Sequence, residues 1–193
     1  MKKKVFLTVI IIILLITGLT VYKVNDYYKK KDYITFRELS EDFKFLASDY
    51  KNIHTYVNSF SFHLKHNYYI YIDLFENNKK IGSNKYLIKD KGIFYQRVNL
   101  DKSKNKAHFY MKDTSSKSGY ITSGDLPFKN INRASSIEYT INGDYNDKIV
   151  LKDNKKRYLG DISFCISPKN EDKLQCEYKD VIEIHIQRTN NKY

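Results

Sequence analysis

The stretch FRELSEDFKFLASDYKNIHTYVNSFSFHL (36–64) carries a regular hydrophobic pattern. Its apolar residues recur at alternating steps of three and four, the spacing that lines one face of an α-helix. The sequence therefore predicts a long amphipathic helix whose apolar stripe is covered by another part of the protein. The stripe comprises Phe36, Leu39, Phe43, Leu46, Tyr50, Ile53, Val57, Phe60 and Leu64.

The same three–four spacing is typical of a coiled coil, so two packings of this helix are open. The stripe is rich in bulky aromatic side chains, among them Phe36, Phe43, Tyr50 and Phe60. Such side chains fill a two-stranded seam poorly and suit a helix that lies across a curved sheet. We therefore favour packing of the helix on a sheet.

Beyond Asn67 the hydrophobic pattern changes to a period of two residues, which indicates β-strands. In DVIEIHIQR (180–188), Ile182, Ile184 and Ile186 alternate with polar residues, as in a half-buried antiparallel strand. Similar runs occur at 68–75, 85–89, 92–98, 107–112, 136–141, 148–153 and 161–167. The predicted fold class is α+β, with the long amphipathic helix packed on one or more antiparallel β-sheets.

The N-terminus has the composition of a membrane anchor. Lys2, Lys3 and Lys4 precede VFLTVIIIILLITGLTVY (5–22), which holds no charged residue. As a helix this segment is about 27 Å long, close to the thickness of the hydrocarbon core of a bilayer. A cleaved signal peptide is the alternative, but the best cleavage position, after Thr20, lacks an A-x-A pattern. We favour a retained single-pass transmembrane helix.

These patterns divide the chain into four parts. They are a basic N-terminus (1–4), a transmembrane helix (5–22), a juxtamembrane segment with the amphipathic helix (23–66), and a β-rich extracytoplasmic domain (67–193).

The chain has two cysteines, Cys165 and Cys176, in two segments that a short polar connection joins. A disulfide between them would close a small loop and would require an oxidising compartment. Two reduced thiols in the cytosol are the alternative. The even number of cysteines and the signal-like N-terminus favour the disulfide, which places residues 33–193 outside the cell membrane.

The net charge is +12, from 34 Lys and Arg against 22 Asp and Glu, which favours anionic partners. In KGIFYQRVNLDKSKNKAHFYMK (91–112), basic residues are interleaved with aromatic ones. This composition is typical of platforms that bind single-stranded nucleic acid, although strand alternation alone also produces it.

No motif indicates catalysis, because the chain lacks a GxSxG elbow, a P-loop and a GxGxxG turn. His63 and His66 lie one helical turn apart but lack a third metal ligand, and NGDYND (142–147) lacks the downstream Glu of a calcium loop. We therefore expect no enzyme activity, no cofactor, no metal and no small-molecule substrate.

The order of parts resembles the type IV pilin and pseudopilin family, most closely the minor pseudopilins. IEYTINGDYNDKIVLKD followed by DISFCIS resembles the C-terminal part of these proteins, and Cys165 and Cys176 match a disulfide that many members carry. The processing motif is absent, because Lys4 precedes the apolar segment and no acidic residue occurs before Asp26.

The resemblance implies a membrane-anchored subunit of a filament, a secretion machine or a DNA-uptake (competence) machine. Its partners would be the membrane and other pilin-like subunits. The alternative is a membrane-tethered, β-rich binding module that recognises an anionic polymer, either a wall polymer or DNA.

Overall fold

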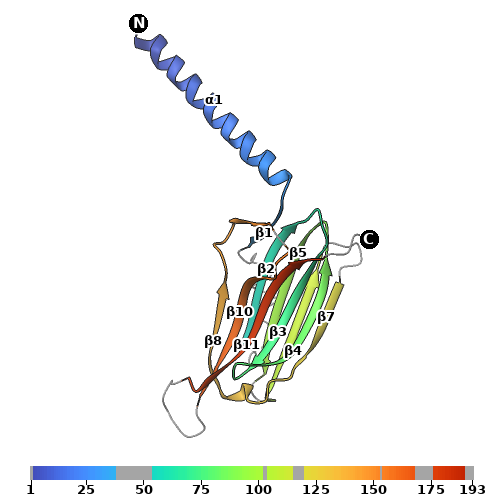
Figure 1. Cartoon of the computed structure of the whole chain (residues 1–193). Coiled ribbons are helices and arrows are strands. Elements are labelled where there is room, and N and C mark those ends of the chain that lie inside the picture. Colours follow the sequence, from blue (N-terminus) through green and yellow to red (C-terminus); the bar gives the residue numbers. More distant parts are fainter. Residues whose placement is uncertain are drawn as a thin grey trace.

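The computed structural model describes residues 2–37, 54–101, 104–114, 120–152, 154–167 and 176–189. These residues form one α-helix and two antiparallel β-sheets (Figure 1). The elements are α1 (Lys2–Lys29), β1 (Asp32–Phe36), β2 (His54–His63), β3 (Tyr68–Glu76), β4 (Lys79–Ile88), β5 (Lys91–Asp101), β6 (Lys106–Asp113), β7 (Tyr120–Leu126), the 3₁₀-helix η1 (Ile131–Arg133), β8 (Ala134–Ile141), β9 (Lys148–Leu151), β10 (Arg157–Ile166) and β11 (Tyr178–Arg188).

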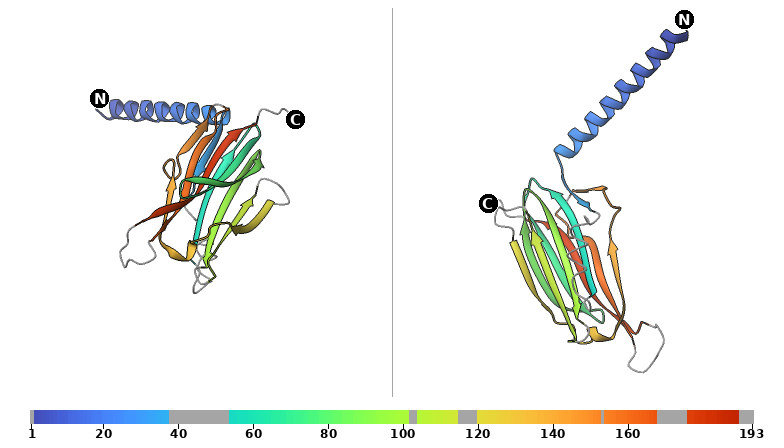
Figure 2. Two further views of the ribbon diagram at one scale, coloured as in Figure 1. Left: turned by 60° about the horizontal axis from the view of Figure 1, so that its bottom comes forward. Right: turned by 180° about the vertical axis from the view of Figure 1, so that it is seen from behind.

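Helix α1 projects away from the sheets (Figures 1 and 2). Within the described part of the chain it is the one helix long and apolar enough to cross a membrane, and none of its apolar segment is buried. A signal sequence near the N-terminus would meet the same description. The first strand, β1, begins only three residues after α1 ends.

The strands form two sheets that stack face to face (Figures 1 and 2). Sheet A has the strand order β7-β6-β5-β2-β1-β9, and sheet B has the order β4-β3-β11-β10-β8. Every pairing within these sheets is antiparallel. The predicted class is thus confirmed in its coarse form, an N-terminal helix followed by antiparallel sheets.

The hydrophobic core lies between the two sheets. Sheet B contributes the isoleucines of β11, and Ile182, Ile184 and Ile186 are at most 1% exposed, as their alternation predicts. Sheet A contributes aromatic residues, and the rings of Phe60 and Phe94 stack with centroids 5.0 Å apart. Burial of such large side chains on both inner faces stabilises the stacking of the sheets.

The amphipathic helix is the main correction to the sequence analysis. Residues 54–63 form strand β2, so the predicted helix is wrong there, and with it the coiled-coil alternative. Phe36, the first residue of the stripe, ends β1 and pairs directly with Phe60 of β2. Both rings are 1% exposed, so they are core residues of a sheet.

The physical reason is a competing period-two pattern. Phe60, Phe62 and Leu64 are all buried, although the helical stripe omits Phe62. As a strand, β2 pairs along its length with β5 and also with β1, which a helix would not allow. Of the remaining stripe residues, Val57 lies in β2, and Leu39, Phe43, Leu46, Tyr50 and Ile53 lie outside the described residues.

Candidate functional site

The outer surface of sheet A carries a group of basic and aromatic side chains on β5 and β6. Alternation directs Phe94, Val98, Phe109 and Met111 into the core, which leaves the residues of opposite parity on the outer surface. There Tyr95 pairs with Lys112, and Arg97 pairs with Tyr110. We call these four residues, Tyr95, Arg97, Tyr110 and Lys112, the basic–aromatic face.

Arg97 is held in place within this face. Its guanidinium carbon lies 4.7 Å from the centroid of the Tyr110 ring, a cation–π contact. The Nε atom of Arg97 is buried and has no hydrogen-bond partner among the residues that the structure describes. A guanidinium fixed on an aromatic ring offers planar donors in the geometry that phosphate groups accept.

The acidic residue at the end of this surface is already paired with cations. Asp125 of β7 accepts hydrogen bonds from His108 at 2.9 Å and from Lys106 at 3.1 Å. These two hydrogen bonds, His108 first, lower the pKa of the Asp125 carboxyl. Asp125 therefore remains ionised and paired with Lys106 and His108, and it does not neutralise Arg97 or Lys112.

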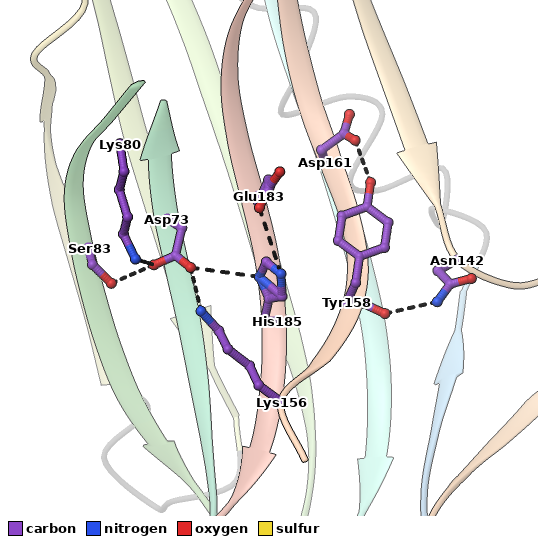
Figure 3. Close-up of polar contacts among 9 residues, drawn as sticks. All are labelled: Asp73, Lys80, Ser83, Asn142, Lys156, Tyr158, Asp161, Glu183 and His185. Atoms are coloured by element: carbon purple, nitrogen blue, oxygen red, sulfur yellow. Dashed lines mark hydrogen bonds and ion pairs between the residues drawn. The ribbon is translucent and has the colours of Figure 1, made fainter. Parts of the chain in front are cut away.

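The outer surface of sheet B has a different character, because it contains a buried carboxylate (Figure 3). The Asp73 side chain on β3 is only 3% exposed. Its oxygens accept from Lys156 at 2.5 Å, from Lys80 at 2.7 Å and from Ser83 at 2.5 Å. Burial raises the pKa of Asp73, but these hydrogen bonds outweigh it and hold the pKa below its ordinary value.

Two further carboxylates lie in register with Asp73 across sheet B. Glu183 of β11 pairs with Asp73 on one side and with Asp161 of β10 on the other. Burial, together with the charges of Asp161 and Asp73, raises the pKa of Glu183. The hydroxyl of Tyr158 donates to Asp161 (Figure 3).

His185 lies beside this row of carboxylates and is neutral at neutral pH. Burial, and then the charge of Lys156, lowers its pKa to about 4. Within the described ranges, no group of three or more His, Cys, Asp or Glu side chains is arranged to hold a metal ion. The network is a set of internal ion pairs that ties Lys156, just before β10, to β3.

A third feature is an open groove of about 530 Å³ between edge strand β4 of sheet B and strands β6 and β7 of sheet A. Its lining is mixed, with Tyr86 and Phe109 beside Ser83, Asn84 and Asp125. The groove offers no concentration of positive charge, so it is a weaker candidate for an anionic partner than the basic–aromatic face.

The structure also places the other residues that the sequence singled out. Cys165 and Cys176 form a disulfide, with their Cα atoms 5.3 Å apart. His63 stacks on Tyr33, whereas Nδ1 of His66 contacts Asp32 at 2.6 Å, so the two histidines have different partners. The segment 142–147 connects β8 to β9.

Sequence reasoning singled out the segment that carries the basic–aromatic face and missed the Asp73 network. The face lies in a segment whose composition is visible in the sequence, 91–112. The network joins Asp73 to Lys156, which is 83 residues later in the chain. The available signal was one acidic residue inside the apolar run YYIYIDLF (68–75).

Comparison of the chain with family models, with curated proteins and with solved structures finds no match in any of the three.

Proposed function

We propose that this protein is a membrane-tethered β-sandwich that binds an anionic polymer through the basic–aromatic face. The observation that carries the proposal is the pairing of Arg97 with Tyr110 and of Tyr95 with Lys112 on one outer surface, where all four residues are half-buried. Cationic groups supply affinity for phosphates along a polymer, and aromatic rings supply flat surfaces for stacking. No catalytic residue is required.

Two features support a location at the outer side of a membrane. Helix α1 is long and apolar enough to be an anchor. The disulfide between Cys165 and Cys176 is a bond that persists in oxidising compartments outside the cytosol. A tether of this kind keeps the sandwich near polymers that lie at the cell surface, which raises its effective concentration there.

The experiment is a binding titration with the full chain in neutral phosphatidylcholine nanodiscs. Single-stranded DNA, a glycerol-phosphate polymer and a neutral dextran are compared over a range of salt concentrations. We expect the two phosphate polymers to bind with affinity that falls as salt rises, and the dextran not to bind. Binding of dextran as strong as that of DNA, or affinity independent of salt, would contradict the proposal.

Variants localise the binding. The double variant R97Q/K112Q should lose at least tenfold in affinity for single-stranded DNA, and the magnitude of the slope of log affinity against log salt should fall by about 1.4. The matched control is K79Q/K85Q on sheet B, because Lys85 also lies over a tyrosine ring, 5.0 Å from the centroid of Tyr69. An equal loss in both double variants would place binding elsewhere.

The filament-subunit function that the pilin resemblance implies stays a prediction. The amphipathic helix on which it depended is a strand over 54–63, and α1 is followed closely by strand β1. Cross-linking in cells tests this function, because it predicts a ladder of multimers joined through residues of α1.

A further inference from the structure

The junction between α1 and the sandwich is built from stacked aromatic rings and a lysine. Tyr28, in the last turn of α1, contacts Tyr33 of β1 edge to face, with ring centroids 5.7 Å apart. The Nζ atom of Lys148 lies 4.5 Å from the centroid of Tyr28 and 5.2 Å from that of Tyr33. Tyr33 in turn stacks on His63, with centroids 5.2 Å apart. These contacts fix the helix end against one end of sheet A.

Three lysines from different elements surround His63 at this end. Lys91 of β5 pairs with His63 of β2, Lys65 follows two residues after it, and Lys148 lies at the start of β9. All three lysines are exposed. Lys148 reaches this place through Tyr33, because its Nζ lies over the Tyr33 ring that stacks on His63. Burial, and then the charges of the three lysines, lowers the pKa of the His63 imidazole.

Asp32 is the carboxylate whose charge acts on His63, and it is already paired with other groups. Asp32 is 6% exposed. It accepts from the backbone N–H of Lys65 at 2.5 Å and from the Tyr68 hydroxyl at 2.9 Å, and it contacts His66. The exposed surface of the cluster therefore presents mainly ammonium groups.

A bilayer spanned by α1 would place the cluster at the outer edge of the lipid headgroups, within reach of the long lysine side chains. If α1 spans a bilayer over 5–22, Tyr28 lies six residues further on, about 9 Å beyond the hydrocarbon core. Headgroups occupy about 5–8 Å on each side of that core. Tyrosines are enriched at membrane–water interfaces, and lysine side chains are favoured there because their apolar stems can be buried while the ammonium group stays among the headgroups.

We propose that Lys65, Lys91 and Lys148, grouped around His63, form a docking surface for the phosphate headgroups of anionic lipids. The docked lipids hold the sandwich against the membrane that anchors it and so fix the direction in which sheet A faces. This inference rests on α1 being a membrane anchor, and it does not depend on the basic–aromatic face.

The test is lysine footprinting of the full chain in nanodiscs, read by mass spectrometry. An amine-reactive label is applied in phosphatidylcholine discs and in discs with about a third phosphatidylglycerol. We expect labelling of Lys65, Lys91 and Lys148 to slow at least threefold in the anionic discs, and labelling of the sheet B lysines Lys79 and Lys85 to change little. Equal labelling of the cluster in both lipids, or equal slowing at all five lysines, would overturn the proposal.

Two further arms identify the source of the phosphate and the role of the cluster. Inorganic phosphate added to phosphatidylcholine discs should not protect the cluster, and protection there as strong as in anionic discs would assign the site to free anions. K148Q should weaken the protection of Lys65 and Lys91 in anionic discs, whereas K85Q should leave it unchanged. Unchanged protection in K148Q would overturn a shared site. These readings use no polymer, so they succeed or fail separately from the proposed polymer binding.

Discussion

The ammonium group of Lys156 lies 2.5 Å from the carboxylate of Asp73, across the outer surface of sheet B. The Lys156 side chain also lies over the ring of Tyr71, with Nζ 4.8 Å from the centroid. Because Asp73 is nearly inaccessible to water, its charge depends on Lys156 and Lys80 for stabilisation. This pairing fixes the segment before β10 onto β3, although the two are far apart in the chain.

Removal of the Asp73 charge should destabilise the protein. D73N keeps the shape of the side chain but leaves two lysines without their counter-ion, so we expect a loss of about 2–4 kcal/mol in the free energy of unfolding. Chemical denaturation at pH 7 measures it. The control is E138Q, which breaks the exposed pair between Glu138 and Lys179 on the same sheet and should cost less than about 1 kcal/mol. Equal losses in D73N and E138Q would show that the burial of Asp73 does not strengthen its ion pairs.

The same carboxylate should make stability depend on acid. The folded pKa of Asp73 lies below the ordinary value of 3.8, so its contribution is complete above about pH 5 and is lost as the pH falls further. The stability difference between the wild type and D73N should therefore be constant from pH 6 to 8 and should narrow below about pH 5. A difference that grows on acidification would mean that the folded pKa of Asp73 is raised and not lowered.

The charge of Asp180 should destabilise the folded protein, whereas the charge of Asp73 stabilises it. The Asp180 side chain is buried in the core, and burial, with the nearby charge of Glu76, raises its pKa to about 6. Its folded pKa exceeds the unfolded one, so its charge destabilises the folded protein increasingly as the pH rises from about 4 to 6. D180N should raise the free energy of unfolding at pH 7 by up to about 3 kcal/mol, and with it the melting temperature. It should have little effect near pH 4.

The control for Asp180 is D144N, in the exposed connection between β8 and β9. It should leave the pH profile of the melting temperature unchanged. Destabilisation by D180N at pH 7 would mean that the charged carboxylate is stabilised in the folded state.

Two substitutions in β2 test whether residues 54–63 form a strand or a helix. Phe62 is 3% exposed in the core, so F62A should cost about 3–5 kcal/mol. Ser61 lies on the outer surface beside it, so S61K should cost less than about 1 kcal/mol. Thermal and denaturant unfolding measure both. An F62A variant as stable as the wild type would favour the helical stripe, which leaves position 62 outside the core.

Loss of the disulfide should also lower stability. C176A removes an exposed half of the bond and leaves the buried Cys165 side chain intact. The two cysteines are separated by 11 positions in the sequence, and the chain-entropy estimate for loss of the bond is about 2–3 kcal/mol. Reductant should lower the melting temperature of the wild type and should not change that of C176A. An equal response of both proteins to reductant would point to another cause.

Features with local signals were predictable from the amino-acid sequence. The uncharged run 5–22 indicates the helix α1, and the alternation of Ile182, Ile184 and Ile186 indicates a strand with one buried face. These predictions succeed because a helix is stabilised by bonds within its own segment and a strand keeps a strict period of two.

The secondary structure of the stripe and the partners of the buried charges depend on contacts between distant strands. Residues 54–63 fit both a helical and a strand pattern, and pairing with β1 and β5 selected the strand, because neighbours distant in the chain supply its hydrogen bonds. The contact of Lys156 with Asp73 and the convergence of Lys65, Lys91 and Lys148 on His63 likewise arise from the order of strands in the sheets. Contacts across such separations leave no periodic signal in the sequence, since they are fixed only when the strands pair.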